Sequence, residues 1–317
     1  MKKHLFLTVI LLFLMILSAC GSDSSDNEQI SIGTGSTGGA YFPIGTGMAK
    51  IISEDNDYLK ATASSTGGSV DNVELIESGD EDFGLVDMSV SYEFYNGDFP
   101  EIRALMMGYG NVFHLVVQDD SPIESYEDLK GKSVAIGPEG SGTANMSEKL
   151  FKSLGIWDDI DKQYLTHDQE TQDLGDGRID AAAYSIAVPG SSVEEFLSAN
   201  NGRIVELEDN TVEKFLEDNP DHVAETIPAE SYSGQEEDIS TIAVNVALVT
   251  HEDTDEDMVY DITKTIMENS DNLEEYHPSA TEFNFDNALD GLEIPLHEGA
   301  KKYYEEEEHP KLDEIEE

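Results

Sequence analysis

The chain has 317 residues and a net charge of −51, from 17 Lys and Arg against 68 Asp and Glu. Because nucleic-acid-binding surfaces must be basic, this balance argues strongly against nucleic acid as a partner. The length predicts two lobes of ordinary domain size, and 38% hydrophobic and 8% aromatic residues allow packed cores rather than wholesale disorder.

The N-terminus has the pattern of an export signal. A basic head at residues 2–4 precedes an uncharged apolar run at 5–17, shorter than the roughly 20 residues that a membrane-spanning helix needs. Residues 17–20, LSAC, resemble a bacterial lipobox, in which the cysteine is lipidated and becomes the mature N-terminus. Cys20 is the single cysteine, which rules out an internal disulfide framework.

We therefore expect residues 1–19 to be a lipoprotein signal peptide and residues 20–29 to be the lipid anchor and a flexible tether. Cys20 would hold the protein to the bilayer on the extracytoplasmic face of the cell membrane. No twin-arginine pair precedes the apolar run, which favours general secretion. The alternative is an ordinary signal peptide followed by a chance cysteine.

Strands and helices then alternate along the chain. The first series predicts strands at 30–33, 59–64, 83–87, 102–107 and 112–118, with helices after the first two. A second series predicts strands at 133–137, 180–185 and 203–207 and a helix over 146–154. A long apolar strand follows at 239–249, and acidic helices run to the C-terminus. This alternation predicts an α/β fold with mainly parallel sheets.

Two such series with a late return predict two lobes. Lobe 1 would comprise residues 30–118 and 239–317, and lobe 2 residues 119–238. We expect the chain to cross between the lobes near 117–120 and 235–243. The acidic tail after residue 304 is interpreted as a solvated surface.

Three glycine-rich turns, each between a strand and a helix, carry the candidate chemistry. They lie at 33–41, 64–69 and 137–143. A helix N-terminus has unpaired N–H groups and about half a positive charge, and glycine lets a ligand approach the backbone. Since the chain has only three arginines, such turns offer a way to bind an anion without a basic side chain. The alternative for each turn alone is simple helix capping.

The first turn also spells G-x-G-x-x-G at Gly33, Gly35 and Gly38, the fingerprint of dinucleotide binding. An export signal argues against a nicotinamide cofactor, so we expect no cofactor. The sequence contains no nucleophile elbow, zinc-protease motif or phosphate loop, and we expect no enzyme activity and no metal site. An exported hydrolase or dehydrogenase remains the enzyme alternative. His114 lies in an apolar strand pattern and is interpreted as a core residue, and the acidic run 252–257 as a solvated turn.

Together these segments resemble the TAXI-type receptors of TRAP (tripartite ATP-independent periplasmic) transporters. The resemblance rests on GTGSTGGAYFPIG at 33–45, SSTGGSVDNVELIESGDEDFGLVD at 64–87, ESYEDLKGKSVAIGPEGSGT at 124–143, DGRIDAAAYSIAVPGSSVEE at 176–195, IPAESYSGQEEDISTIAVNVALVT at 227–250 and IPLHEGAKKYYEEEEH at 294–309. It covers about residues 30–309. It implies a two-lobed type II periplasmic-binding-protein-like fold with a ligand cleft between the lobes.

The resemblance further implies a monomeric solute-binding receptor that closes on a small carboxylate, such as a glutamate-like amino acid or a dicarboxylate. The receptor would deliver this ligand to a TRAP-type membrane permease. By position, the implied ligand-binding residues are Thr37, Gly38, Tyr41, Ser65, Ser69, Asn72, Asp87, Ser141, Gly142, Thr143, Tyr184 and Ser185. These residues do not distinguish a receptor that serves transport from one that presents the ligand to a membrane histidine kinase.

Two points about this site stay open at the level of sequence. Asp87 would either accept a hydrogen bond from a ligand amino group or brace the site. The family often has glycines after the strand that holds Tyr184, whereas this chain has Ser185-Ile186-Ala187-Val188. These bulkier side chains are expected to narrow the pocket.

The acidic surplus predicts a salt-dependent stability. Removal of residues 1–19 takes away Lys2 and Lys3 and leaves 15 basic against 68 acidic residues, a net charge of 15 − 68 = −53. At about 1 M salt the Debye length falls to about 3 Å, which screens this self-repulsion. The free energy of unfolding of the mature domain should therefore be larger in about 1 M KCl than in about 0.05 M KCl, as measured by urea denaturation. Our hypothesis is a halophilic protein from a salt-rich habitat, and the alternative is an acidic surface kept only for solubility. Equal stability in both buffers would contradict the hypothesis.

Overall fold

The computed structural model describes residues 27–200 and 202–315. The predicted signal peptide, the predicted lipidation site Cys20 and most of the predicted tether lie outside these residues, and β1 (Glu28–Gly33) begins where the tether was expected to end. Within the described ranges, no helix is long and apolar enough to cross a membrane.

The first half of the chain follows the predicted alternation. After β1 come α2 (Tyr41–Asp55), β2 (Leu59–Ser64), α3 (Ser69–Ser78), β3 (Phe83–Asp87), α4 (Met88–Tyr95), β4 (Ile102–Gln118), the 3₁₀ helix η1 (Tyr126–Leu129), β5 (Ser133–Ala135), α5 (Gly142–Ser153), the 3₁₀ helix η2 (Trp157–Asp159) and β6 (Asp161–Gln163). β4 is one strand of 17 residues where the sequence predicts two. α3 stops at Gly79, whose φ of 76° suits a left-handed helix cap.

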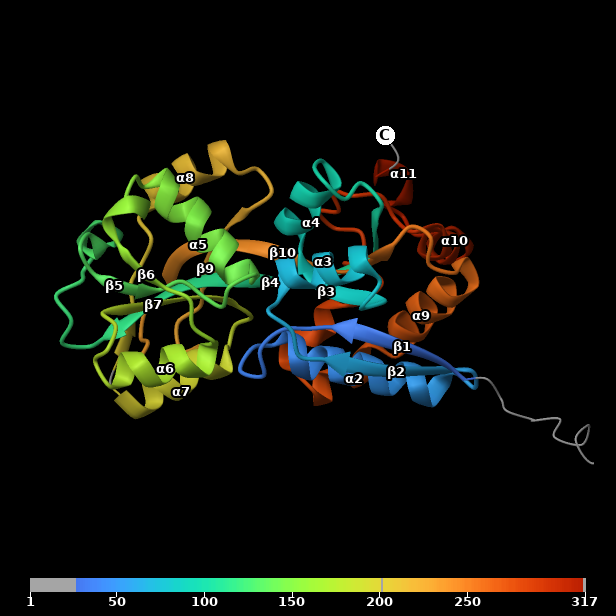
Figure 1. Ribbon diagram of the computed structural model, residues 1–317, viewed down its shortest axis with the longest axis horizontal. Coiled ribbons are helices and arrows are strands. Elements are labelled where there is room, and N and C mark those ends of the chain that lie inside the picture. Colours follow the sequence, from blue (N-terminus) through green and yellow to red (C-terminus); the bar gives the residue numbers. More distant parts are fainter. Residues whose placement is uncertain (1–26, 201, 316–317) are drawn as a thin grey trace, which may run out of the picture.

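The second half contains α6 (His167–Gly175), β7 (Ala181–Ile186), α7 (Ser191–Asn200), β8 (Gly202–Ile204), α8 (Asp209–Asp218), β9 (Val223–Ile227), β10 (Ile239–His251), α9 (Glu256–Glu268), the 3₁₀ helices η3 (Ser270–Glu275) and η4 (Pro278–Glu282), α10 (Glu298–Glu306) and α11 (Leu312–Ile315). The C-terminal helices return to the strands that began the chain (Figure 1).

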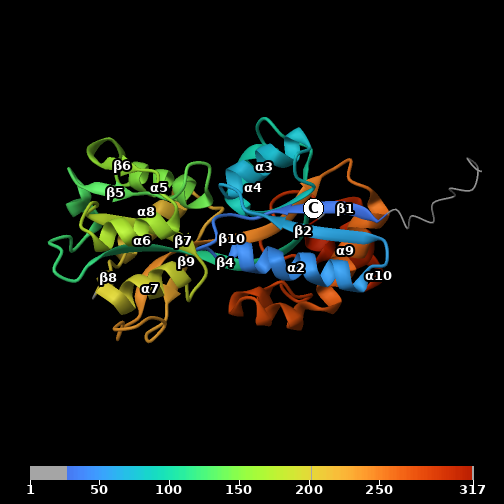
Figure 2. The same ribbon diagram turned by 60° about the horizontal axis from the view of Figure 1, so that its bottom comes forward.

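The strands form a continuous sheet in the order β2-β1-β3-β10-β4-β7-β5-β6, with β8 beside β4 and β9 beside β10. Parallel pairs lie toward both ends of this order, in β1–β2, β1–β3, β5–β6 and β5–β7. The long strands β4 and β10 pair antiparallel in the middle and run from one lobe into the other (Figures 1 and 2). The fold is therefore the two-lobed α/β fold that the sequence predicts.

The hydrophobic cores show where each lobe begins. One cluster gathers side chains from β1–β3, the first half of β4 and the C-terminal helices, and defines lobe 1. Two clusters on opposite faces of the other strands define lobe 2, with α5 and α8 on one face and α6 and α7 on the other (Figure 1).

The chain changes core between Tyr109 and Val112 in β4 and between Val244 and Val246 in β10. The sequence places the first crossing some residues later, at 117–120, and the second slightly earlier, at 235–243. The alternation of apolar residues continues through both strands, so periodicity alone does not mark the point at which a strand passes from one core to the next.

Candidate functional site

A small cavity lies between the two lobes. Its volume is about 40 Å³, enough for about three or four groups the size of a water molecule. The residues that line it are Gly35, Ser36, Gly39, Ala40, Tyr41, Gly67, Gly68, Ser69, Asp87, Asn111, Pro138, Ser141, Gly142, Thr143, His167, Ser185 and Ile186. Parts of all three glycine turns are among them, which agrees with the rule that ligands bind beyond the carboxyl ends of strands in open α/β sheets.

The lobe 1 wall is built around the carboxylate of Asp87. This residue ends β3 and is 1% exposed. Its Oδ1 accepts hydrogen bonds from the Tyr41 hydroxyl at 2.7 Å and from Asn111 Nδ2 at 2.7 Å, and its backbone N–H donates to Ser69 Oγ at 3.1 Å. Asn111 Nδ2 also lies 3.1 Å from the Tyr41 hydroxyl. Asp87 therefore braces Tyr41 and Asn111 through one oxygen.

Burial controls the ionisation of the Asp87 carboxyl. It raises the pKa of Asp87, although the hydrogen bonds from Tyr41 and Asn111 favour the charged form and offset part of the effect. Burial and the neighbouring Asp87 charge also raise the pKa of Tyr41 well above its usual value. Tyr41 therefore stays a neutral hydroxyl that donates to Asp87.

The lobe 2 wall is formed by the third glycine turn and the start of α5. Ser141 is the N-cap: its Oγ accepts from the Ala144 N–H at 3.0 Å. Gly142 and Thr143 belong to the first turn of α5, whose N–H groups have no acceptor within the helix, and both line the cavity. Thr143 Oγ1 accepts from the Ser185 N–H at 3.2 Å and so ties α5 to β7.

Ser185 supplies an unpaired group to this wall. Its hydroxyl oxygen is buried and has no hydrogen-bond partner among the described residues. A buried unpaired hydroxyl costs about 1–3 kcal/mol, unless a bound molecule satisfies it. Because Ser185 lines the cavity, a polar ligand is the partner that this position can accept.

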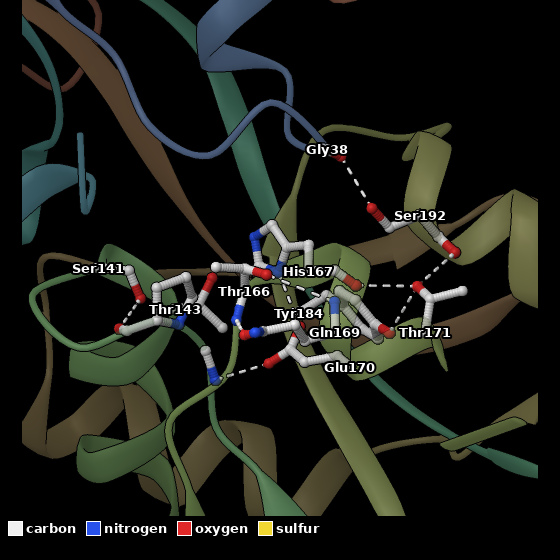
Figure 3. A network of polar contacts seen from close by, with 12 residues as sticks. Gly38, Ser141, Thr143, Thr166, His167, Gln169, Glu170, Thr171, Tyr184 and Ser192 are labelled. Atoms are coloured by element: carbon white, nitrogen blue, oxygen red, sulfur yellow. Dashed lines mark hydrogen bonds and ion pairs between the residues drawn. The ribbon is translucent and has the colours of Figure 1, made fainter. Parts of the chain in front are cut away.

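His167, at the start of α6, completes the wall. Its Nδ1 lies 2.8 Å from Oε2 of Glu170, and the two residues are part of a buried polar network (Figure 3). Nothing in the sequence singled out His167 beyond a capping box at Thr166 and Gln169 that starts the helix after β6.

The lobes are in contact around the cavity. The N–H groups of Val70 and Asp71, at the start of α3, donate to the Gly140 carbonyl across the cleft at 3.0 and 3.2 Å. On the opposite rim, the Gly38 carbonyl accepts from the hydroxyls of Ser191 and Ser192, each at 2.9 Å (Figure 3 shows the Ser192 bond). The N-terminus of α3 therefore donates hydrogen bonds to the third glycine turn, in lobe 2, and also faces the cavity.

An ion pair at the outer edge of the cleft also joins the two lobes. Lys149 of α5 lies 2.8 Å from Glu93 of α4 and 3.2 Å from Asp221. Burial alone would raise the pKa of Asp221, but its hydrogen bond and charge interaction with His222 and the Lys149 ammonium lower it to about 2. Asp221 therefore stays ionised beside Lys149.

The structure brings seven of the twelve sequence-predicted residues together on the cavity wall. These are Tyr41, Ser69, Asp87, Ser141, Gly142, Thr143 and Ser185. The first three come from lobe 1 and the last four from lobe 2, as the sequence predicts.

The other five lie outside the wall. Thr37 is exposed, and Gly38 makes the rim contact described above. Ser65 donates to the Gly35 carbonyl at 2.9 Å, and buried Asn72 donates to the carbonyls of Thr34 and Leu85. These two side chains therefore hold the first two turns in shape from behind.

Tyr184 is the fifth of these residues. It is fully buried behind His167, with ring centroids 5.3 Å apart. β7 alternates its side chains between faces, so Tyr184 and Ser185 point to opposite sides and only Ser185 reaches the cavity.

The wall also contains Asn111 and His167, which the sequence did not identify. Asn111 lies within β4, between the two strands that the sequence predicts, and only the pairing of β4 with β10 places it next to Asp87. Its signal would have been a polar residue inside an otherwise apolar strand.

The turn with the dinucleotide fingerprint and the side chain of His114 both contact other parts of the protein. The carbonyl of Gly38, the last glycine of the fingerprint, accepts from Ser191 and Ser192, so this turn is part of the contact between the lobes. His114 is buried, as expected, and burial lowers its pKa to about 4.

Comparison with known proteins identifies the family. The model of the NMT1-like family matches residues 32–307, so the chain belongs to this family. Among solved structures, a putative L-cystine ABC transporter protein from Listeria monocytogenes is similar at 17% identity and a TM-score of 0.54, covering 82% of this chain and 98% of that one.

Two further structures share the fold. One, from Streptococcus mutans, is described for glutathione import via GshT and the cystine ABC importer TcyBC. It has 15% identity and a TM-score of 0.51 and covers 86% of this chain and 99% of that one. The alkanesulfonate-binding protein SsuA from Xanthomonas axonopodis pv. citri, bound to MOPS, has 14% identity and a TM-score of 0.50, covering 87% and 82%. At these identities the similarity shows the two-lobed binding-protein fold.

The contact between Gly142 and Asp87 leads to a prediction about closure. A Cβ on Gly142 would overlap Oδ2 of Asp87 and lie 2.9 Å from Ser69 Oγ, so the lobes cannot approach this closely in Gly142→Ala. We expect a more open average conformation, seen as a larger radius of gyration in X-ray scattering, with no loss of helix stability. Gly35→Ala is the matched control, because its nearest atoms belong to Tyr41 and Gly68 of the same lobe, at 3.7 Å and beyond. An unchanged radius in Gly142→Ala would show that the lobes do not close to this contact in solution.

Proposed function

We propose that this protein is an extracytoplasmic solute-binding receptor that holds a small carboxylate between its lobes and delivers it to a membrane permease. The observation that carries the proposal is the cavity between the lobes, with helix N-termini and the unpaired Ser185 hydroxyl on its wall. The family and the fold support the same function.

The donors on the lobe 2 wall suit one carboxylate group. The first turn of α5 has N–H groups without acceptors, and the helix adds a partial positive charge. Together with the unpaired hydroxyl of Ser185, these groups form an anion site without lysine or arginine on the wall. This agrees with the expectation from the glycine turns.

Asp87 favours an amino acid over a dicarboxylate. Its Oδ1 is already bonded to Tyr41 and Asn111, whereas Oδ2 faces lobe 2 next to Gly142. A ligand ammonium group at this oxygen would neutralise a buried charge that nothing else on the wall of lobe 1 compensates. A second carboxylate in the same place would be repelled.

The size of the cavity sets a limit on the ligand. The cavity has room for about three or four water-sized groups, and glutamate has more non-hydrogen atoms than that, so binding such a ligand requires the lobes to stand further apart than they do here. The hinge strands β4 and β10 connect lobes with separate cores and would permit this movement.

For the partner, we propose a TRAP-type permease. The support is the resemblance of the segments at 33–45, 64–87 and 124–143 to TAXI receptors. The similar solved structures named above include components of ABC importers, so an ATP-driven permease is the rival outcome. Uptake of ligand by cells that make the protein separates the two: collapse of ion gradients stops a TRAP permease, and depletion of ATP with the gradients clamped stops an ABC importer. Ligand-dependent activity of a histidine kinase without uptake would instead indicate sensing.

We further propose that the mature protein is a monomer anchored to the outer face of the cell membrane through lipidated Cys20. The support is the lipobox-like sequence at 17–20. Metabolic labelling with a radioactive fatty acid should mark the wild type and fail to mark Cys20→Ser.

A thermal-shift screen tests the ligand class. We expect small amino acids and glutamate-like carboxylates, in about 1 M KCl, to raise the melting temperature. Ligand at 100 times its Kd stabilises the folded state by about 2.7 kcal/mol. Neutral sugars and polyamines serve as controls. Stabilisation by these controls alone would rule out a carboxylate ligand.

The unpaired hydroxyl of Ser185 gives a more specific test of the binding site. Ser185→Ala should weaken binding of the ligand found in the screen by about 5- to 10-fold, since one hydrogen bond contributes about 1 kcal/mol. The free protein should keep its stability, because the hydroxyl has no other partner. Ser147→Ala is the matched control: its hydroxyl is also buried and unpaired, but it does not line the cavity. Equal affinity in both variants would remove Ser185 from the binding site.

Asp87→Asn separates an amino-acid ligand from a dicarboxylate. Affinity for L-glutamate should fall about 10- to 100-fold, whereas affinity for succinate should not fall. Because the folded state raises the pKa of Asp87, its contribution to stability is present below the unfolded pKa of about 4 and is lost as the pH rises through the folded value. The free variant should therefore melt at least as high as the wild type at pH 7. A parallel loss of affinity for both probes would indicate a bracing role alone.

A further inference from the structure

His167 is the one ionisable side chain that lobe 2 contributes to the cavity wall. It is the first residue of α6 and is 6% exposed. Its ring lies against Tyr184, and the network around it includes Thr171 and Ser192 (Figure 3). The wall of described residues contains no lysine or arginine, so His167 is the single wall residue that can carry a positive charge.

Glu170 fixes the orientation of this ring. Its side chain is fully buried, with Oε2 2.8 Å from His167 Nδ1 and Oε1 accepting the Gly137 N–H at 2.9 Å. Burial raises the pKa of Glu170, and the charge and hydrogen bond of His167 oppose this rise. Glu170 thus connects the imidazole to the third glycine turn.

With Nδ1 engaged, the other edge of the ring is free for a ligand. A Cβ on Gly39 of the first turn would lie 3.6 Å from Cδ2 of His167, so this edge, which includes Nε2, is directed toward lobe 1. Across the cavity are Gly39 and the Tyr41–Asp87 pair.

The charged and titratable groups around His167 come from several elements. Glu170 and Asp168 lie on α6, Tyr184 on β7, and Asp87 and Tyr41 on the facing lobe. Glu195 of α7 acts on Tyr184. All of these groups are acidic or neutral, so none of them adds a positive charge beside His167.

We propose that His167 binds the ligand carboxylate as an imidazolium, through its Nε2–H, and that ligand binding therefore takes up a proton, with Glu170 as the positioning residue. The inference rests on the proposed function as a carboxylate receptor and specifies how that site obtains its positive charge. It makes the receptor pH-dependent: affinity is highest where the ring is protonated and falls as the pH rises.

Titration calorimetry with L-glutamate and succinate, in about 1 M KCl at about pH 8, tests the proton uptake. The observed enthalpy is compared in HEPES and Tris, whose ionisation enthalpies differ. The wild type should take up close to one proton for each ligand bound, and its affinity should fall up to about tenfold per pH unit above the range in which histidine titrates.

Two variants assign the proton. His167→Gln keeps an N–H donor near the Nε2 position but cannot be protonated, so proton uptake and the pH dependence should disappear while some binding remains. Glu170→Gln should weaken binding and reduce proton uptake. His251→Gln, at the far end of β10, is the matched control and should behave as the wild type. Melting temperatures of the free variants report on folding.

A measurement on the wild type avoids dependence on these variants. In protein labelled with ¹⁵N-histidine, ligand should move the ring nitrogens of one histidine from the neutral to the imidazolium chemical shift at about pH 8. Unchanged proton uptake in His167→Gln, or no such shift in the wild type, overturns the inference while carboxylate binding still supports the proposed function. If no carboxylate binds the wild type in either assay, the proposed ligand class fails as well.

Discussion

The carboxylate of Asp87, buried at the carboxyl end of β3, is the group around which this molecule is arranged. A buried charge must be hydrogen-bonded or neutralised, and Tyr41 and Asn111 both donate to it from different elements of lobe 1. Its second oxygen faces Gly142 of lobe 2, where only a residue without a side chain permits contact. The same group therefore organises the wall of one lobe and limits how closely the other can approach.

The acidic composition agrees with the kind of donors that line the cavity. With 17 basic residues in 317, the chain places helix N-termini and one imidazole on the cavity wall rather than lysine or arginine. Such donors are fixed by the backbone and need no flexible side chain. The buried Glu170 then serves two purposes, since it holds both His167 and the turn that begins at Gly137.

The contacts between the lobes differ in kind from the hydrophobic packing within each lobe. They include a few hydrogen bonds to the carbonyls of Gly38 and Gly140, and the ion pair of Lys149 with Glu93 near the solvent-accessible edge, where Asn145 also donates to Glu93. Each such contact contributes little net free energy, because water competes for the same groups. Lobes joined in this way can separate without disturbing either core, which suits a protein that must admit and release a ligand.

The sequence by itself determined the alternation of strands and helices, the two-lobed fold and the three turns at which helices begin, because periodicity, glycine and capping residues act over a few neighbouring positions. It also placed Tyr41, Ser69, Asp87 and the 141–143 segment on the cavity wall. Only the tertiary structure decided that Asn72 and Tyr184 lie behind the wall, that Asn111 and His167 lie on it, and where β4 and β10 pass between cores. These outcomes depend on strand pairing and on which face of a strand or helix is turned inward, and residues far apart in the chain set both.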